Sequence, residues 1–237
     1  MKILADYHTH TIFSHGKGTI EDNVKMALEK GIGILGISDH SHKHITYGVK
    51  KSDIPIMRGE IDLLNEKYPD IKILLGLECN VLDDKGNIDV DDNDRKYLDY
   101  VMAGYHFGSK PTSLTAALNH FENYTMKSEK AKIYNTNAVI NAMKKNDIFC
   151  ITHPGDKGDV YIEDVAKVAF ETDTRLEINS SHNFLNAEQI QKIKSIRNKF
   201  IIGSDAHAPI KVGNFNLAMK TVKESDLDVS LIENIIL

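Results

Sequence analysis

Ile3-Leu4-Ala5-Asp6-Tyr7-His8-Thr9-His10 sets a pattern that the rest of the chain repeats. Residues 3–7 form a short, largely apolar run that predicts a buried strand, and two histidines follow directly at its end. Phe200–Ser204 is a second such run, and Asp205-Ala206-His207 follows it in the same way. The sequence therefore predicts strands whose ends carry imidazole and carboxylate groups.

Seven candidate strands alternate with amphipathic stretches along the chain. The strands lie at Ile3–Tyr7, Gly33–Ser38, Ile71–Leu77, Tyr100–Tyr105, Ile148–Thr152, Arg175–Asn179 and Phe200–Ser204. Helical patterns lie at Ile20–Lys30, Ser52–Lys67, Ser128–Lys145, Ile162–Thr172, Ala187–Ile196 and Val229–Ile236. Alternating strands and helices pair the strands in parallel through right-handed crossovers, and seven units suit a closed or nearly closed barrel. Because no Pro/Gly/Ser-rich linker divides the chain, we expect one domain over residues 1–237.

The composition excludes several classes of protein. The chain has 237 residues, of which 41% are hydrophobic, and a net charge of -5. Disordered chains have fewer apolar residues and a higher net charge. The negative balance argues against a general nucleic-acid-binding surface, which is usually basic.

The cysteines and the first residues predict a cytoplasmic protein. Cys79 and Cys150 lie far apart in apolar runs, so we expect buried thiols and neither a disulfide framework nor a zinc finger. The first residues lack the apolar core of a signal peptide. No apolar run reaches the roughly 18 residues of a membrane span, so we expect no membrane contact.

Six of the seven predicted strands carry side chains that can bind metal at their carboxyl ends. These side chains are His8, His10, His15, His40, Glu78, His106, His153, Asp205 and His207. The carboxyl ends of parallel barrel strands converge on one face, where such enzymes hold their active sites. Imidazole with carboxylate suits zinc, manganese or iron, whereas calcium and magnesium prefer oxygen ligands. Because this set exceeds the needs of one four-coordinate ion, we expect two or three ions.

Each of these pieces also has an ordinary structural interpretation. His40 alone could be a hydrogen-bonded buried histidine, Asp205 could cap a helix, and His153 could be a loop residue. Asp39, beside His40, could orient a ligand imidazole or serve the fold alone. The joint placement at the strand ends is what favours metal sites.

The remaining histidines receive weaker assignments. His42 and His44 either line the mouth of the site or are exposed, and His120 is predicted on the surface of a helix. His182 follows the sixth strand, where it could approach a substrate.

The segment Asp83–Asp94 carries six aspartates. Counted from Asp89, an EF-hand loop would need glycine at Asp94 and glutamate at Tyr100, so that site is excluded. A charge run of this kind is typical of a solvated surface loop, which is the prediction here.

At the strand ends the chain resembles the PHP family, the polymerase and histidinol phosphatase domains, and within it the YcdX-like stand-alone phosphoesterases. The matching pieces, in the family's order, are His8-Thr9-His10-Thr11, Ser14-His15-Gly16, Ser38-Asp39-His40, Gly76-Leu77-Glu78, Gly104-Tyr105-His106, Thr152-His153-Pro154, Leu176-Glu177-Ile178-Asn179 and Gly203-Ser204-Asp205-Ala206-His207. The resemblance implies an α/β fold, a distorted (β/α)7 TIM-like barrel with parallel strands, and a trinuclear metal centre.

By position, the resemblance also implies a ligand set. One ion would be held by His8, His10, Glu78 and Asp205. Glu78 would bridge to a second ion, held also by His106 and His153. The third would be held by His15, His40 and His207. The resemblance implies three divalent transition-metal ions, with zinc first and manganese or iron as alternatives.

The implied activity is hydrolysis of a small phosphomonoester by a metal-activated hydroxide, as in histidinol phosphatases. Glu78 and Asp205 are assigned to catalysis through the ions, and His182 is a candidate acid for the leaving group. Lys157, Lys17 and Lys211 follow strand ends; each is a candidate for contacting phosphate, although an ordinary solvated surface charge is the favoured interpretation. We expect a small-molecule phosphoester as the partner, and the sequence predicts no particular oligomeric state.

Three alternatives stay open from the sequence. The same ions could serve a phosphodiesterase or nuclease, although the acidic balance and the lack of an aromatic and basic stripe disfavour nucleic acid. A metal-binding module without turnover is a second alternative. An amidohydrolase is a third, although that superfamily usually has a carboxylated lysine where Glu78 stands here.

Overall fold

A sheet of seven parallel strands forms the centre of the computed structural model, which describes residues 2–236. In sheet order the strands are β2 Ala5–Asp6, β3 Ile34–Ile37, β4 Lys72–Asn80, β5 Tyr100–Gly104, β6 Cys150–Ile151, β7 Arg175–Asn179 and β8 Phe200–Gly203. Thr9 and Ala206 form a parallel bridge just beyond β2 and β8. The sheet is therefore nearly closed at its carboxyl ends, which confirms the predicted α/β barrel.

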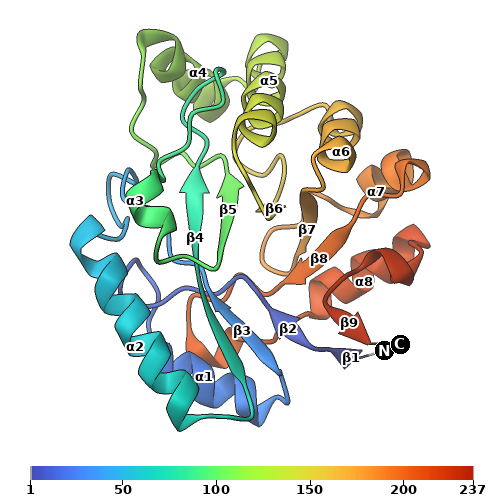
Figure 1. The fold of residues 1–237 in the computed structure, drawn as a ribbon. Helices are drawn as coiled ribbons and strands as arrows, with labels where there is room; N and C mark the ends of the chain where they lie inside the picture. Colours follow the sequence, from blue (N-terminus) through green and yellow to red (C-terminus); the bar gives the residue numbers. More distant parts are fainter. Residues whose placement is uncertain (1, 237) are drawn as a thin grey trace.

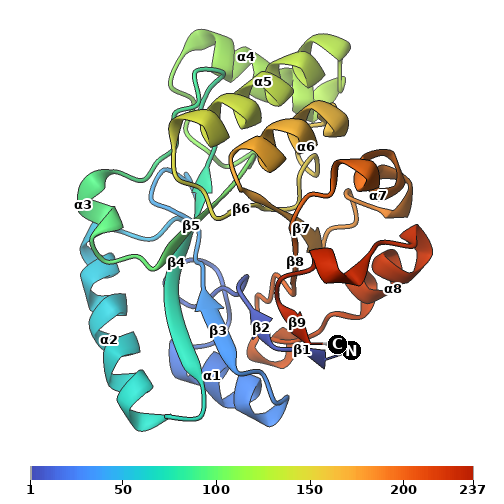
Figure 2. The ribbon, with the colours of Figure 1, turned by 45° about the vertical axis from the view of Figure 1, so that its right-hand side comes forward.

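Helices surround the strands on the outside (Figures 1 and 2). They are α1 Ile20–Glu29, α2 Ile54–Lys67, α3 Asp92–Arg95, α4 Leu114–Thr125, α5 Glu129–Lys145, α6 Ile162–Glu171, α7 Ala187–Ile193 and α8 Asn216–Ser225. Short 3-10 helices lie at Lys51–Asp53, Lys194–Ile196, Pro209–Lys211 and Val229–Leu231. Local sequence sets where α1 begins, through a capping box. The Thr19 hydroxyl accepts from the Asp22 amide at 3.1 Å, and the Asp22 carboxylate accepts from the Thr19 amide at 2.9 Å.

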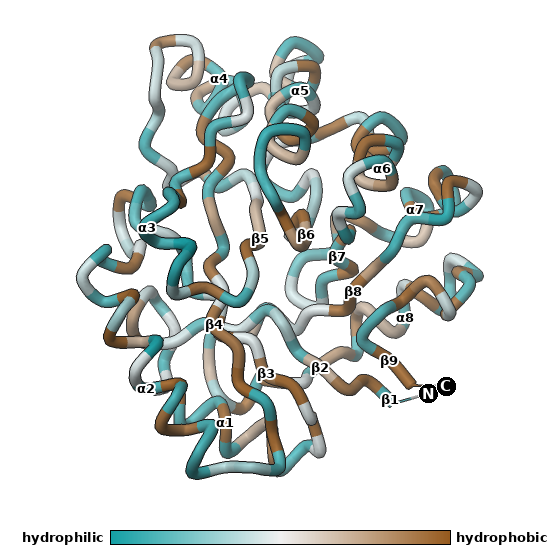
Figure 3. The backbone as a smooth tube through the Cα atoms, in the orientation of Figure 1, coloured by the Kyte–Doolittle hydropathy of each residue, from teal (hydrophilic) through white to brown (hydrophobic). Residues whose placement is uncertain are grey.

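The core lies between the sheet and the helices. Leu35, Ile37 and Leu75 are fully buried on the strands, and Ile20 and Ile61 are fully buried on the helices that cover them. In Figure 3, hydrophobic residues accordingly run along several strands and alternate with hydrophilic residues along the helices. Each such side chain contributes about 2 kcal/mol on burial, so the apolar periodicity of the sequence specifies this layer.

The C-terminal segment corrects one prediction. Val229–Ile236 is not a helix: a 3-10 turn at Val229–Leu231 leads to β9 Ile235–Ile236, which pairs antiparallel with β1 Lys2–Ile3. The Asn234 side chain accepts from the Ile202 amide at 3.0 Å and donates to the Ala5 carbonyl at 2.8 Å. These bonds hold an extended backbone between β2 and β8. Met1 and Leu237, the first and last residues of the expected single domain, lie outside the described residues.

The acidic segment corrects another. Asp83, Asp89 and Asp94 are buried, so residues 83–94 are not simply a solvated loop. Asp83 accepts from the amides of Lys85 and Asn87, and Asp94 closes a capping box at the start of α3. The carboxylates are buried because backbone donors satisfy them, which a charge count cannot reveal.

Two smaller expectations have clear outcomes. Cys79 and Cys150 are free and buried, as predicted. Among residues 2–236, none of the helices is long and apolar enough to cross a membrane.

Candidate metal centre

The carboxyl ends of the strands place one carboxylate, Glu78, among five imidazoles. Glu78 Oε1 lies 2.9 Å from His153 Nε2 and 3.1 Å from His106 Nε2. Its Oε2 lies 2.9 Å from His40 Nδ1, 3.4 Å from His8 Nε2 and 3.7 Å from His10 Nε2. Glu78 stands on β4, near the middle of the sheet, so side chains from both sides of that strand reach it.

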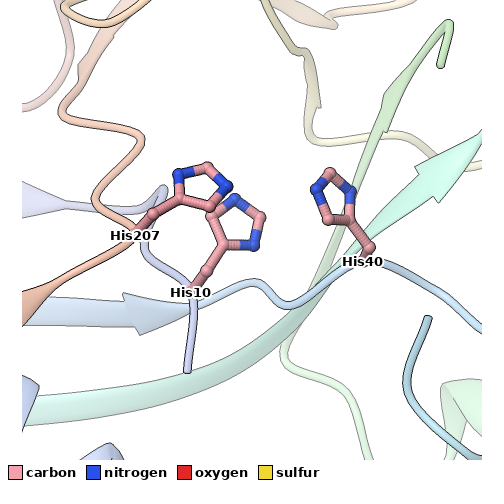
Figure 4. A group of neighbouring side chains, drawn as sticks. All are labelled: His10, His40 and His207. Atoms are coloured by element: carbon pink, nitrogen blue, oxygen red, sulfur yellow. The ribbon is translucent and has the colours of Figure 1, made fainter. Parts of the chain in front are cut away.

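A second carboxylate, Asp205, lies against the histidines that follow β2 and β8. Asp205 Oδ1 lies 3.3 Å from His10 Nε2, 3.6 Å from His8 Nε2 and 3.3 Å from His207 Nδ1. Figure 4 shows His10, His40 and His207 arriving from separate segments with their rings close together. The ring of His15 lies 4.1 Å from that of His207 and 4.9 Å from that of His40, centre to centre.

Four groups of three side chains bring their ligand atoms within 4.8 Å of one another. They are His8 with Glu78 and His153, His8 with His10 and Asp205, His40 with Glu78 and His106, and His10 with His40 and His207. Every predicted ligand except His15 belongs to a group, and His15 lies beside two members. The predicted set is therefore one cluster in space.

Buried atoms without partners test whether divalent ions fit this cluster. In the described part of the chain, no hydrogen bond reaches His8 Nε2, either ring nitrogen of His10, His40 Nδ1 or Glu78 Oε2. A buried polar atom left in this state costs about 1–3 kcal/mol. The donors are the imidazole nitrogens and carboxylate oxygens that transition ions prefer, so the residues fit such ions.

Local electrostatics keep the two carboxylates of the cluster ionised, and against the effect of burial the acidic neighbours raise the pKa of His8, chiefly through Glu177, and the pKa of His153 to about 8, chiefly through Glu78. Burial works against ionisation of Glu78, but the imidazoles of His106, His8 and His40 hold the pKa of Glu78 well below its usual value. His8 and His10 do the same for the pKa of Asp205, again against burial. Burial lowers the pKa of His10 well below its usual value. Ionised carboxylates beside a neutral imidazole are the result.

Asp39 supports the loop that follows β2. It accepts from the Thr11 amide at 2.7 Å, from the Thr11 hydroxyl at 2.5 Å and from the Ser14 hydroxyl. Burial raises the pKa of Asp39 to about 6 despite these bonds. Its nearest ring nitrogen, His10 Nδ1, is 4.0 Å away, which is too far for a hydrogen bond.

Glu177 is a functional candidate to which sequence reasoning gave no role. Its fully buried carboxylate accepts from His8 Nδ1 at 2.7 Å, from the His153 amide at 2.8 Å and from Asn179 Nδ2 at 2.9 Å. It thereby fixes which nitrogen of His8 faces Glu78. The available signal was a charged residue inside the apolar run of β7.

A cavity of about 320 Å³ opens over the cluster. It is lined by His15, His40, Tyr47, Glu78, His106, His153, Lys157, His182, Asp205 and His207. Tyr47 is the second residue that sequence reasoning missed, and its ring lies 4.0 Å from that of His15, centre to centre. Lys17 and Lys211 are exposed, and neither lines this cavity.

His182 lies beside the cluster, as its position after β7 predicts. Its Nε2 lies 3.4 Å from Asp205 Oδ2, and its Nδ1 lies 3.1 Å from Asp156 Oδ2. Lys157 Nζ contacts the same Asp156 oxygen at 2.6 Å. Asp156 therefore holds an imidazole and an ammonium group side by side at the cavity wall.

The contacts of two further histidines, His44 and His120, show where they lie relative to the cavity and the surface. His44 is buried, and its ring stacks on Tyr47 at 3.7 Å, which places it behind the cavity wall. The surface prediction for His120 is wrong. His120 Nε2 donates to the Ser109 carbonyl at 3.1 Å and its Nδ1 accepts from the Tyr105 hydroxyl, so His120 joins α4 to the loop after β5.

Backbone conformation is unusual at two of the clustered residues. His153 has a φ of 26° and Asp205 has a φ of 52°. These positive values lie in the left-handed region, which residues other than glycine rarely adopt. Such residues cost about 1–3 kcal/mol each and persist where the surroundings fix them.

Comparison with known proteins agrees with this geometry. The model of the PHP domain family matches residues 6–181. A protein of Thermoanaerobacter sp. (strain X514) named "Probable phosphatase" is 31% identical over 252 residues, which cover 99% of this chain and 91% of the relative.

Two solved structures share the fold. The "putative histidinol phosphatase" of Listeria monocytogenes has a TM-score of 0.65 at 18% identity, covering 88% of this chain and 97% of its own. Histidinol phosphate phosphatase of Lactococcus lactis subsp. lactis Il1403, solved with zinc, L-histidinol and phosphate, has a TM-score of 0.61 at 15% identity and covers 94% of both chains.

Proposed function

The chain belongs to the PHP domain family, and from this premise we propose that it is a metal-dependent phosphatase acting on a small phosphomonoester. The observation that carries the proposal is Glu78, whose two oxygens meet five imidazole nitrogens within 3.7 Å while one of those oxygens has no hydrogen bond among the described residues. The curated relative named a phosphatase supports the reaction class. We assign the activity to residues 1–237 acting as one domain.

We propose three divalent transition-metal ions, with zinc first. Two ions would share Glu78: one held also by His8, His10 and Asp205, the other by His106 and His153. The third would be held by His15, His40 and His207. The four overlapping groups of ligand atoms support a site for several ions. When bound, such ions supply a water of lowered pKa and offset the negative charge that develops on the phosphoryl oxygens.

The side chains around the ions have separate tasks. Lys157, at the cavity wall, would bind a phosphoryl oxygen as a point charge. His182, held by Asp156 on one side, would face the leaving oxygen and deliver a proton to it. The proposed phosphate contacts of Lys17 and Lys211 stay predictions.

The size of the cavity supports a small substrate. About 320 Å³ lies at the lower end of the range for small-molecule sites. The alcohol part of the substrate would lie toward Tyr47, which lines the cavity outside the ligand cluster. A histidinol-phosphate-like substrate is one such molecule.

The test is turnover by purified protein reconstituted with zinc or manganese. p-Nitrophenyl phosphate and a panel of phosphorylated metabolites should be hydrolysed, and bis-p-nitrophenyl phosphate and single-stranded DNA should be hydrolysed far more slowly. No turnover of any monoester by protein that has bound its ions would contradict the proposal. Faster cleavage of the diesters would establish the phosphodiesterase alternative in its place.

A further inference from the structure

We propose that Asp89, from the acidic segment, is a positioning residue for the metal centre: through Asn80 it fixes the imidazole of His106 with Nε2 turned to Glu78. This inference rests on the proposed metal-binding function. It gives a role to a segment that the proposed reaction leaves unused, and it links that segment to the proposed ligands.

Two hydrogen bonds in series join the three side chains. Asn80 Nδ2 donates to Asp89 Oδ2 at 2.7 Å. At the other end of the same amide, Asn80 Oδ1 accepts from His106 Nδ1 at 3.0 Å. His106 Nε2 then lies 3.1 Å from Glu78 Oε1. The series therefore ends at the carboxylate in the middle of the metal cluster.

The chemistry of each group gives the series one direction. An ionised carboxylate only accepts hydrogen bonds, so Asp89 draws the NH2 end of the Asn80 amide toward itself. The amide oxygen must then face His106, and it places the imidazole proton on Nδ1. A neutral imidazole carries one ring proton, which leaves the lone pair of Nε2 facing Glu78. Two acceptors then oppose each other across 3.1 Å, an arrangement that a cation stabilises.

Burial makes Asp89 the group that decides this orientation. Asn80 is fully buried and Asp89 is 3% exposed, so bulk water does not compete for the amide. The one other acceptor of Asn80 Nδ2 in the described residues is the Ser41 hydroxyl at 3.2 Å. A hydroxyl also donates, so Ser41 by itself would permit either orientation of the amide.

Asp89 also joins two strand ends through backbone donors. Its Oδ1 accepts from the Asn80 amide at 2.7 Å, and its Oδ2 accepts from the Lys43 amide at 3.0 Å. Lys43 lies in the loop that carries His40 away from β3. One carboxylate therefore spans the ends of β3 and β4 and reaches β5 through His106.

Asp89→Asn is a sharp test because it changes one atom and one charge. If the new amide oxygen faces the Asn80 backbone, its NH2 group meets two donors, Asn80 Nδ2 and the Lys43 amide. If the amide is reversed, its NH2 group meets the Asn80 backbone amide. Either orientation sets donor against donor: the first no longer holds the Asn80 side-chain amide, and the second loses the bond to the Asn80 backbone that positions that side chain.

Asp83→Asn is the matched control from the same segment. Asp83 is also a buried acceptor, taking bonds from Asn87 Nδ2 at 2.8 Å and from the Thr112 hydroxyl at 2.9 Å. Its replacement creates the same kind of conflict, but none of its partners contacts a proposed ligand. Both variants should lower the melting temperature of the metal-free protein.

The experiment measures zinc binding by competition with a chromophoric chelator, using wild type, D89N, D83N and His106→Ala. H106A identifies the binding step that depends on His106. D89N should weaken that step about tenfold, in the range typical of residues that orient metal ligands, while D83N leaves it unchanged. The exchanged pair N80D/D89N restores a donor and an acceptor between the two residues and keeps an oxygen for His106. It should recover most of the loss.

Each outcome decides a different statement. Equal zinc binding by D89N and wild type, or equal weakening by D83N, would overturn the role of Asp89 and leave the metal site intact. Wild type that binds no zinc would overturn the proposed function and this inference with it. Should D89N not fold, Asn80→Ala removes the acceptor of His106 while keeping the backbone bonds of Asp89. It should produce the same shift in zinc binding.

Discussion

The two ends of the barrel bring rings together at similar spacing but with opposite chemistry. At the amino ends of β5 and β6, the rings of Tyr100 and Phe149 lie 5.9 Å and 5.1 Å, centre to centre and edge to face, from the ring of Tyr7, which follows β2. At the carboxyl ends, His10 lies 4.2 Å from His207 and 4.6 Å from His40. The aromatic rings attract one another without any further partner.

The polar atoms of the two ends differ in the same way. The Tyr100 hydroxyl donates to the Tyr7 carbonyl at 2.6 Å, which satisfies that phenol within the barrel. At the other end, both ring nitrogens of His10 are without a partner in the described part of the chain. The amino end therefore satisfies this phenol by itself, whereas the carboxyl end presents ring nitrogens that a bound ion would satisfy.

Cavity size alone would not have identified the candidate metal centre, because larger cavities lie against α8 and at the amino ends of the strands. A larger cavity, of about 420 Å³, lies at the amino ends beside Phe149 and Arg175. The Arg175 guanidinium there is already paired with Glu233 at 2.6 Å. The charged groups of the larger cavity pair with one another. The smaller cavity over the cluster is the better candidate for a ligand site, because imidazole nitrogens there have no hydrogen-bond partner among the described residues.

The largest effect should come from the carboxylate in the middle of the rim. Glu78→Gln should reduce phosphatase activity by at least about a thousand-fold, because the amide cannot supply two anionic oxygens to the ions. The metal-free variant should keep its fold, since the change removes a buried charge. Turnover of p-nitrophenyl phosphate and circular dichroism check both. If the variant kept activity within tenfold of wild type, Glu78 would not be essential to the phosphatase reaction, and the proposed functional difference between the two ends of the barrel would be smaller.

The second-largest effect should come from removing the metal ions, which should lower the free energy of unfolding. Zinc at about a thousand times its dissociation constant stabilises the folded state by about 4 kcal/mol for each ion that binds only that state. Urea unfolding curves with zinc and with chelator should differ accordingly. Coincident curves would mean that the unpaired donors hold no ion. Phe149→Ala, used as a control background, should show the same difference.

At the amino end, Phe149→Ala should act on stability alone. The side chain is half-buried and contacts both tyrosines, so its loss should cost about 2 kcal/mol of unfolding free energy. The ratio kcat/KM per folded molecule should stay within twofold of wild type. A large loss of activity at unchanged metal content would show that the two ends are coupled.

The smallest effect should separate the cavity wall from the outer surface. Lys157→Met should lower kcat/KM about tenfold through loss of a charge on the substrate phosphate. Lys211→Met is its matched control, because Lys211 also follows a strand but does not line the cavity, and it should have no measurable effect. If both variants lowered kcat/KM equally, the effect of Lys157 would come from the overall electrostatic potential of the protein and not from a contact with the substrate.

Features that depend on neighbouring residues were predictable from the sequence. Apolar runs identify the strands, and the side chain that follows each run must lie at the carboxyl edge of a parallel sheet. His8, Glu78 and Asp205 could therefore be grouped without coordinates. The capping box at Thr19 and Asp22 is local for the same reason.

Features that depend on distant partners were not predictable in this way. Glu177 contacts His8 across 169 positions, and Asp89 matters through Asn80 and His106, which no periodicity connects. Asn234 imposes an extended backbone on a segment whose apolar spacing suits a helix, because its partners lie on β2 and β8. A surface prediction for His120 failed because Tyr105 and Ser109 supply its hydrogen bonds.

The left-handed backbone at His153 and Asp205 has a consequence for laboratory evolution. Glycine and asparagine adopt such φ values more readily than histidine does, so replacing either residue with them relaxes the chain while removing a proposed ligand. Selection for thermal tolerance alone, in chelator and without any requirement for turnover, should enrich these replacements early. Stability and activity thus make opposite demands at His153 and Asp205. Variants enriched by such a selection would be more stable but catalytically inactive.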